Sequence, residues 1–169
     1  TEGELFYSDS GKEFKVGVTV NAWASGENAI NLTNSAGPAG TQTAGLTFGG
    51  RNPNGPAFVS TTEEYDGTDW AAATAIPTGK KGIFGGMGTQ TNCLLASGSI
   101  GTTGNTGCHT YDGTNWAASP AMATGRHAGA SGGTSTLAFA AGGNAGSAAG
   151  SNATEEFTGV ATARSVDTT

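Results

Sequence analysis

Apolar residues in this chain fall in short runs that end at glycine, and no helical period of 3.6 residues stands out. Three runs follow the same design, at residues 46–50, 94–98 and 137–143, and each ends in Gly-Gly or Ser-Gly. Short apolar runs bounded by turn-forming residues are typical of β-strands. The pattern therefore predicts an all-β chain of short strands and tight turns.

Aromatic side chains recur at a fixed period, which indicates that the strands belong to a repeat. A Tyr or Phe returns every 46 residues, at Tyr65, Tyr111 and Phe157. A Trp returns at intervals of 47 and 46 residues, at Trp23, Trp70 and Trp116. The last unit carries Thr162 where the next Trp would fall, and terminal units of repeat arrays often differ from the others.

Each unit reads as four strands. The first is a Gly-rich run, placed at residues 81–86 in the middle unit, and the second is the Leu-containing run that ends in the double glycine. The third carries the Tyr or Phe, and the fourth begins at the Trp. Asp-Gly pairs at 66–67 and 112–113 predict tight turns between the third and fourth strands, because Gly accepts a positive φ.

The chain divides into two parts on this basis. Alternation around a Ser-Asp-Gly turn predicts a β-hairpin in an N-terminal attachment segment, residues 1–22. The repeat domain follows at 23–169, with units at about 23–70, 71–116 and 117–169.

The recurring rings and glycines are predicted to form the core. Sheets rich in Gly, Ala and Thr bury little apolar area, so large rings are needed between them. A double glycine marks a strand that bends sharply or approaches a crowded axis. The alternative is that the rings stack on a ligand. The predicted core residues are Trp23, Trp70, Trp116, Tyr65, Tyr111, Phe157, Gly49, Gly50, Gly142 and Gly143.

Composition narrows the function classes. Gly accounts for 30 of 169 residues, which makes disorder an alternative, but the net charge of only −6 and the periodic rings favour a folded chain. The acidic balance argues against a nucleic-acid partner. No apolar run is long enough to span a membrane as a helix. The chain begins at Thr1, which indicates a processed product or a fragment.

Gly-Gly at the end of the second strand, an aromatic residue on the third and Trp on the fourth resemble the kelch motif across residues 36–160. The segments AGTQTAGLTFGG, TEEYDGTDW and HTYDGTNW resemble kelch-like repeats in tail and fibre proteins of bacteriophages, notably cyanophages. The resemblance implies three four-stranded blades of the β-propeller type behind an N-terminal hairpin. No copper-radical cluster of some kelch relatives is matched, so we expect no cofactor.

The resemblance also implies a function. The expected protein is a structural, non-enzymatic component of the virion, a tail fibre or fibre tip, with other virion proteins as partners. Binding of a host surface polysaccharide is a further expectation. The alternative is a secreted or cell-surface carbohydrate-binding propeller of a bacterium.

Three units are fewer than the roughly four to eight blades that close a propeller. The chain therefore leaves open strand edges, which predict self-association. A homotrimer around a fibre axis is favoured, and a six-bladed ring of two chains is the second choice. Residues 1–30 could supply late strands and residues 125–160 early ones, which would join the ends of the array.

Cys93 and Cys108 are a candidate disulfide. A hairpin centred between them would place the two residues opposite each other, within reach of a bond. Assembly in a reducing cytoplasm favours free thiols, and both states remain open.

Other candidate chemistry is sparse. His109 and His127 lack metal-ligand spacing, and the pair Asp66 and Asp69 suits either turn chemistry or a contact with Ca²⁺ or a sugar. The loops between second and third strands, residues 51–60, 99–107 and 144–153, are rich in Asn, Gly, Ser and Thr. They are either solvated turns or glycan contacts. The candidate contact residues are Arg51, Asn52, Asn54, Phe58, Asn105 and Asn144.

Overall fold

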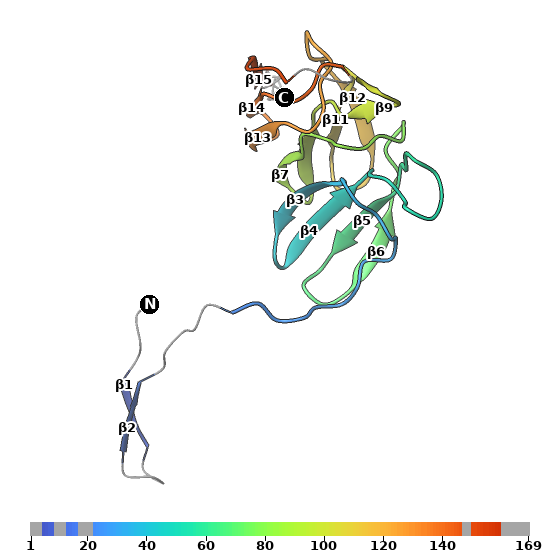
Figure 1. The fold of residues 1–169 in the computed structure, drawn as a ribbon. Coiled ribbons are helices and arrows are strands. Elements are labelled where there is room, and N and C mark those ends of the chain that lie inside the picture. The colour runs from blue at the N-terminus through green and yellow to red at the C-terminus, as the bar shows by residue number, and fades with distance from the viewer. Residues whose placement is uncertain (1–4, 9–12, 17–21, 147–149, 160–169) are drawn as a thin grey trace, which may run out of the picture.

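The structure, a computed structural model, describes residues 5–8, 13–16, 22–146 and 150–159. Every regular element in these residues is a β-strand, and every strand pair is antiparallel. Figure 1 shows the strands gathered into separate small sheets. The all-β fold expected from the short apolar runs is confirmed.

Three sheets form the body of the repeat region, and in each one the strands lie side by side in chain order. The first sheet contains β3 (Gly37–Thr41), β4 (Ala44–Phe48), β5 (Thr62–Tyr65) and β6 (Trp70–Ala73). The second contains β7 (Gly86–Thr89), β8 (Asn92–Leu95), β11 (Cys108–Tyr111) and β12 (Trp116–Ser119). The third contains β13 (Ala130–Gly133), β14 (Leu137–Ala141) and β15 (Thr154–Thr158).

Two hairpins lie outside these sheets. β1 (Leu5–Ser8) pairs with β2 (Glu13–Val16), which confirms the N-terminal hairpin. β9 (Ser99–Ile100) pairs with β10 (Thr103–Gly104) inside the loop that joins β8 to β11. Thr162, which stands where the Trp after Trp116 would fall, lies outside the described residues.

In the first two units the predicted second, third and fourth strands are confirmed, and in the third unit the predicted fourth strand lies outside the described residues. The predicted first strand of the middle unit is wrong. β6 and β12 begin at the Trp, as expected. The first strand of the middle unit is not residues 81–86 but β7, which starts at Gly86. Residues 82–85 lie in no strand, and Gly82 and Gly85 have positive φ of 56° and 99°. The glycine-rich run is therefore the connection into the sheet.

Glycine is required where the first strand of each sheet turns into the second. Gly40, Gly88 and Gly133 hold equivalent places and all have positive φ. A Cβ at Gly88 would collide with the carbonyl oxygen of Asn92 on the opposite strand. This geometry explains the repeated Gly-Thr signature before each Leu-containing run.

The double glycine marks a sharp bend at the end of the second strand. Gly49 and Gly50 have φ of 64° and 106°, and Gly142 and Gly143 have φ of 68° and 82°. In the middle unit the first of the two positions is Ser97, a non-glycine residue with φ of 57°. The left-handed backbone, rather than a lack of space alone, selects small residues here.

The core lies between the sheets. β7 lies beside β3 on one side and β13 on the other, and a Cβ at Gly86 would collide with Ala39 and Cys93. Between the first and second sheets, the buried cluster is Leu46, Phe48, Ile76, Ile83, Cys93, Leu95 and Tyr111. Between the second and third, it is Phe84, Met87, Leu94, Ala96, Cys108, Ala138 and Ala140.

Three of the six predicted core rings pack against the buried clusters. Tyr111 is buried, and Trp116 and Phe157 are partly buried against the two clusters. Tyr65 and Trp70 are half-buried and stack on each other with ring centroids 4.9 Å apart. The prediction for Trp23 is wrong. Its side chain is fully exposed, and the residue lies outside every strand of the described chain.

The candidate disulfide between Cys93 and Cys108, which the sequence left open, is not formed. Both cysteines are free, and they belong to different clusters on opposite faces of the second sheet. The register pairs Cys93 with Tyr111, not with Cys108, because the β9–β10 hairpin lengthens the connection. Successive side chains of a strand point to opposite faces, so a shift by an odd number of residues separates the two thiols.

Candidate functional site

The three variable loops leave the sheets at equivalent places. An isolated two-residue bridge holds the start of each loop to the segment that enters the same sheet: Asn34 with Arg51, Lys81 with Ser99, and His127 with Asn144. The three bridges therefore align the loops along one edge of the array. This edge is the surface on which we expected ligand contacts.

A buried arginine anchors the loop of the third sheet. The Arg126 side chain is 0% exposed and donates to the carbonyl oxygens of Gly142 (2.8 Å) and Ala153 (2.6 Å), at the two ends of the loop. Its Nη2 lies 3.1 Å from Oε1 of Glu155, and its guanidinium lies over the ring of Phe84. Arg126 therefore holds the two ends of this loop together.

Lys80 holds the equivalent place in the second sheet, 46 residues earlier. The buried ammonium donates to the carbonyl oxygen of Gly107 (3.0 Å) and to Oδ1 of Asn105 (3.4 Å). Burial lowers the pKa of Lys80 below its ordinary value. Asn105 Oδ1 also accepts from the backbone N–H of Gly107, so this candidate glycan residue is occupied in holding the loop.

Two glutamates clamp the segments that lead into the first and third sheets. Glu63 accepts from the backbone N–H groups of Ile30 (3.1 Å) and Asn31 (2.8 Å). Glu155, 92 residues later, accepts from those of Ala123 (2.7 Å) and Thr124 (3.3 Å). The middle unit has His109 at this position. Burial, and then the nearby Lys80, lower the pKa of His109.

The remaining candidate residues stay at the loop surface. Arg51 and Asn54 are exposed, and Asn52 Oδ1 accepts from the backbone N–H of Asn54 (2.9 Å), which shapes the turn. Phe58 is half-buried with the Lys81 ammonium 5.3 Å from its ring centroid. The structure brings these four residues to one loop.

The other predicted positions make turns and bridges. Asn144 pairs through its backbone with His127 and with Gly150. Asp66 Oδ1 accepts from the backbone N–H groups of Thr68 and Asp69, both at 2.8 Å, and these bonds lower the pKa of its carboxyl. Asp112 repeats this arrangement with Thr114 and Asn115, and its pKa is lowered for the same reason. The aspartates serve turn chemistry.

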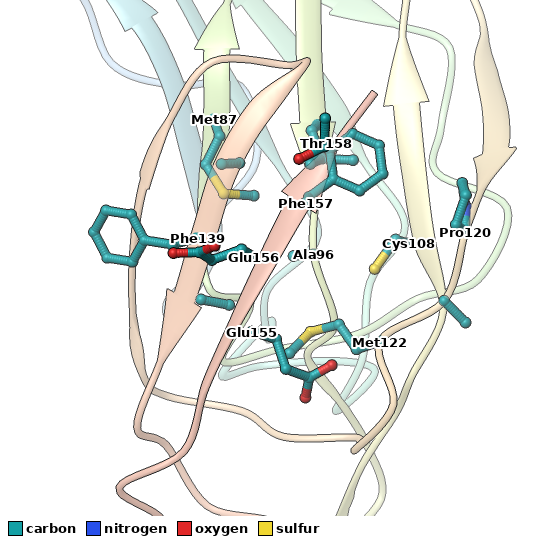
Figure 2. A pocket seen from close by; sticks show the side chains of 14 residues that line it. Met87, Ala96, Cys108, Pro120, Met122, Phe139, Glu155, Glu156, Phe157 and Thr158 are labelled. Carbon is teal, nitrogen blue, oxygen red and sulfur yellow. The ribbon is translucent and has the colours of Figure 1, made fainter. Parts of the chain in front are cut away.

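A cavity of about 260 Å³ lies between the second and third sheets. Figure 2 shows Met122, Cys108, Ala96 and Phe157 around it, whereas the ring of Phe139 points away. At the junction of the first and second sheets, Trp116 occupies the equivalent space, where it contacts Phe48, Thr62 and Thr74. The residues at the positions equivalent to Phe48, Thr62 and Thr74 in the next unit line the cavity: Ala96, Cys108 and Pro120.

Two kinds of feature are absent from the part of the chain that the structure describes. No group of three or more His, Cys, Asp or Glu side chains there could hold a metal ion. No helix in those residues is long and apolar enough to cross a membrane.

These features define an all-β repeat protein whose antiparallel sheets pack side by side. No protein-family model and no curated protein matches its sequence. Among solved structures, the chain is similar to YjhT, with a TM-score of 0.62 and 14% identity over 93% of this chain and 48% of that chain. The chain thus spans about half the length of YjhT, and a likeness at this identity shows the fold alone.

The sequence alone did not identify Lys80 and Arg126, the buried cations that hold the loops. The signal that could have found Lys80 and Arg126 is the pair Gly-Lys and Gly-Arg at 79–80 and 125–126, repeated at the period of the rings. A cation that keeps the period of the core is a candidate for the interior, where a charge must be hydrogen-bonded.

Proposed function

We propose that the chain is a structural component of a phage virion, a tail fibre or fibre tip, built from propeller-type blades of the kelch class. The observation that carries the proposal is that different residues hold the sheets together and hold the loops in place. Rings and aliphatic side chains join the sheets, while buried Lys80 and Arg126 fix loops that differ from unit to unit. A rigid repeat with variable loops along one edge suits an exposed recognition surface.

The loop of the first sheet is the part of this surface that best suits a sugar. Asn54 and Arg51 offer exposed polar groups in the same loop as Phe58, whose half-buried ring has the Lys81 ammonium 5.3 Å from its centroid. Flat rings with adjacent amide and guanidinium donors suit stacking on and hydrogen bonding to a sugar. We therefore assign binding of a host surface polysaccharide to this loop and expect no catalytic turnover.

Mass spectrometry of purified particles tests the virion assignment. The phage whose genome encodes this chain should carry the polypeptide in washed, density-purified virions. A polypeptide recovered only from the lysate of infected cells, and absent from particles, would contradict the proposal and favour a secreted carbohydrate-binding propeller.

Binding to polysaccharide extracted from the host surface tests the second part. Phe58→Ala and Arg51→Ala should each weaken binding by roughly tenfold, the size expected for losing one good contact. Thr68→Ala, at an exposed turn away from this loop, is the matched control. Equal binding by all four proteins would remove the loop from the proposal.

A further inference from the structure

The junction between the first and second sheets shows which side chains join neighbouring units. Tyr111 Oη donates to Oε1 of Glu64 across the junction at 2.8 Å. Trp116 Nε1 donates to Oγ1 of Thr62 (3.2 Å) and to the carbonyl oxygen of Thr74 (3.0 Å). A Tyr and a Trp on the later sheet thus meet a Glu and a Thr on the earlier one.

The junction between the second and third sheets lacks both partnerships. Phe157 stands where Tyr111 would be, and Thr110 stands where Glu64 would be. Cys108 replaces Thr62, and the sequence has Thr162 in place of the Trp. The donor and its acceptor change together at each position, which indicates that the pairs belong to junctions rather than to single sheets.

The two open ends of the array carry the complete set again. Tyr65 and Trp70 lie on the face of the first sheet that points away from the second, and we call this the head face. Glu156 and Thr154 lie on the face of the third sheet that points away from the second, because Phe157 and Glu155 point toward it. We call this second surface the tail face.

The tail face is also apolar at its centre. Phe139 is 44% exposed and Leu137 is 63% exposed, and both flank Glu156 in the strand register. A hollow of about 260 Å³ lies along these residues. Large apolar side chains left in water beside a hollow indicate a surface that another protein covers.

We propose that copies of this chain associate head to tail, with the head face of one copy on the tail face of a second copy. Tyr65 then donates to Glu156, and Trp70 donates to Thr154, as Tyr111 and Trp116 do to Glu64 and Thr62 within the chain. The stacked rings of the head face cover the exposed apolar residues of the tail face. The partner is a second copy because its head face supplies this full set of complementary groups.

Trp23 completes the same contact. The segment that follows it is clamped by Glu63, as the segment that follows Trp116 is clamped by Glu155. Trp23-Ala24-Ser25 therefore stands where the fourth strand of a preceding sheet would lie, in the manner of Trp116-Ala117-Ala118. In the pair of copies, this segment lies along β15, the edge strand of the partner's third sheet, and its indole enters the cavity between the second and third sheets.

Two copies close the arrangement. Two chains with three sheets each bring six, within the range of about four to eight blades for closed propellers, whereas three chains would bring nine. This count, which rests on the propeller architecture proposed above, favours two chains over the trimer that the sequence suggested. The head-to-tail junction does not depend on it.

Sedimentation at micromolar concentration tests the proposal with the full chain. We expect a species of twice the chain mass of 16.5 kDa. Phe139→Asp on the tail face and Trp70→Ala on the head face should each weaken association at least about tenfold, as expected for central interface residues. Thr102→Asp, on the exposed turn between β9 and β10, is the control that should leave association unchanged.

Mixing the two variants distinguishes head-to-tail contact from contact between identical faces. A Phe139→Asp chain keeps a normal head face and a Trp70→Ala chain keeps a normal tail face, so a mixture should form one-to-one pairs that neither variant forms alone. Circular dichroism confirms that both are folded. No pairing in the mixture or a single-chain mass for the parent protein would each overturn the head-to-tail proposal, and a three-chain mass would overturn its closure by two copies.

Trp23→Ala tests the strand exchange. We expect weaker association and loss of a blue-shifted component in the indole fluorescence, because the indole moves from water into the cavity on association. Unchanged association, with the blue-shifted component retained, would overturn the strand exchange.

Discussion

Two buried cations, at equivalent positions in two units, solve the same problem with different chemistry. Arg126 reaches three backbone carbonyls and a carboxylate, whereas Lys80 reaches one carbonyl and one amide oxygen. A guanidinium has five donors in a fixed plane, and an ammonium is a compact charge that gives up its proton more easily when buried. The arginine site is therefore the more costly one to remove.

We expect Arg126→Met to lower the free energy of unfolding by about 3 kcal/mol, because it removes the buried guanidinium that joins the carbonyl oxygens of the loop ends to Glu155. Lys80→Met should cost clearly less, since its acceptors are neutral and its charge is already disfavoured by burial. Urea denaturation of both variants checks the order. An equal loss of unfolding free energy in the two variants, or a larger loss for Lys80→Met, would mean that the guanidinium bonds do not stabilise the fold more than the ammonium bonds.

His109 gives the fold a pH dependence of known sign. Its folded-state pKa lies below the ordinary value of 6.5, so at mildly acidic pH the unfolded chain binds more protons than the folded one. Stability is therefore lost as pH falls below about 6.5 through the folded-state pKa. His109→Asn should lose less stability than the parent between pH 7.5 and pH 5.5, measured by urea denaturation. A larger loss would reverse the inferred sign.

At the scale of strands, local pattern and long-range register differ in how far the sequence reveals them. The second, third and fourth strands were predictable because rings, Asp-Gly turns and double glycines mark their ends within a few residues. The faces of the cysteines were not, because they depend on the β9–β10 insertion between β8 and β11. Trp23 was misassigned because its period is that of a core position, whereas the sheet that would bury it is not part of its own unit.

The register makes a direct prediction about the thiols. Denatured protein, alkylated without reductant, should gain two adducts in its intact mass, because Cys93 and Cys108 are both free. In the folded protein at pH 8, Cys93 should react slowly, since burial raises its pKa to about 12 and leaves little thiolate. A mass two hydrogens lower, without adducts, would contradict the register.

The Tyr–Glu contact between sheets can be measured as a coupling. Tyr111→Phe should cost about 1.5 kcal/mol of unfolding free energy, a value expected for a hydrogen bond to a charged group. A double-mutant cycle with Glu64→Gln reports the part that belongs to the pair. Independent, additive losses would show that the hydroxyl and the carboxylate do not act together.

For the whole molecule, the sheets form a linear array in which the second sheet packs on each of its neighbours. Stability in such arrays is close to a sum over units and junctions. A third kind of junction, between copies, adds to that sum only when the chains associate.

The melting temperature should therefore rise with protein concentration in the parent chain and stay constant in Phe139→Asp. Scanning calorimetry over a hundredfold range of concentration checks this difference. A concentration-independent melting temperature in both proteins would mean that the tail face adds nothing to folding stability.

The contacts that hold the start of each loop have a consequence for how the sequence of such a protein can evolve. Each loop begins beside a two-residue bridge, and in the second and third sheets a buried cation holds it as well. Whatever replaces the residues in between, the strands on either side keep their pairing. Mutation can thus change or lengthen the loop that each unit presents to its surroundings, one unit at a time, without any adjustment of the sheets.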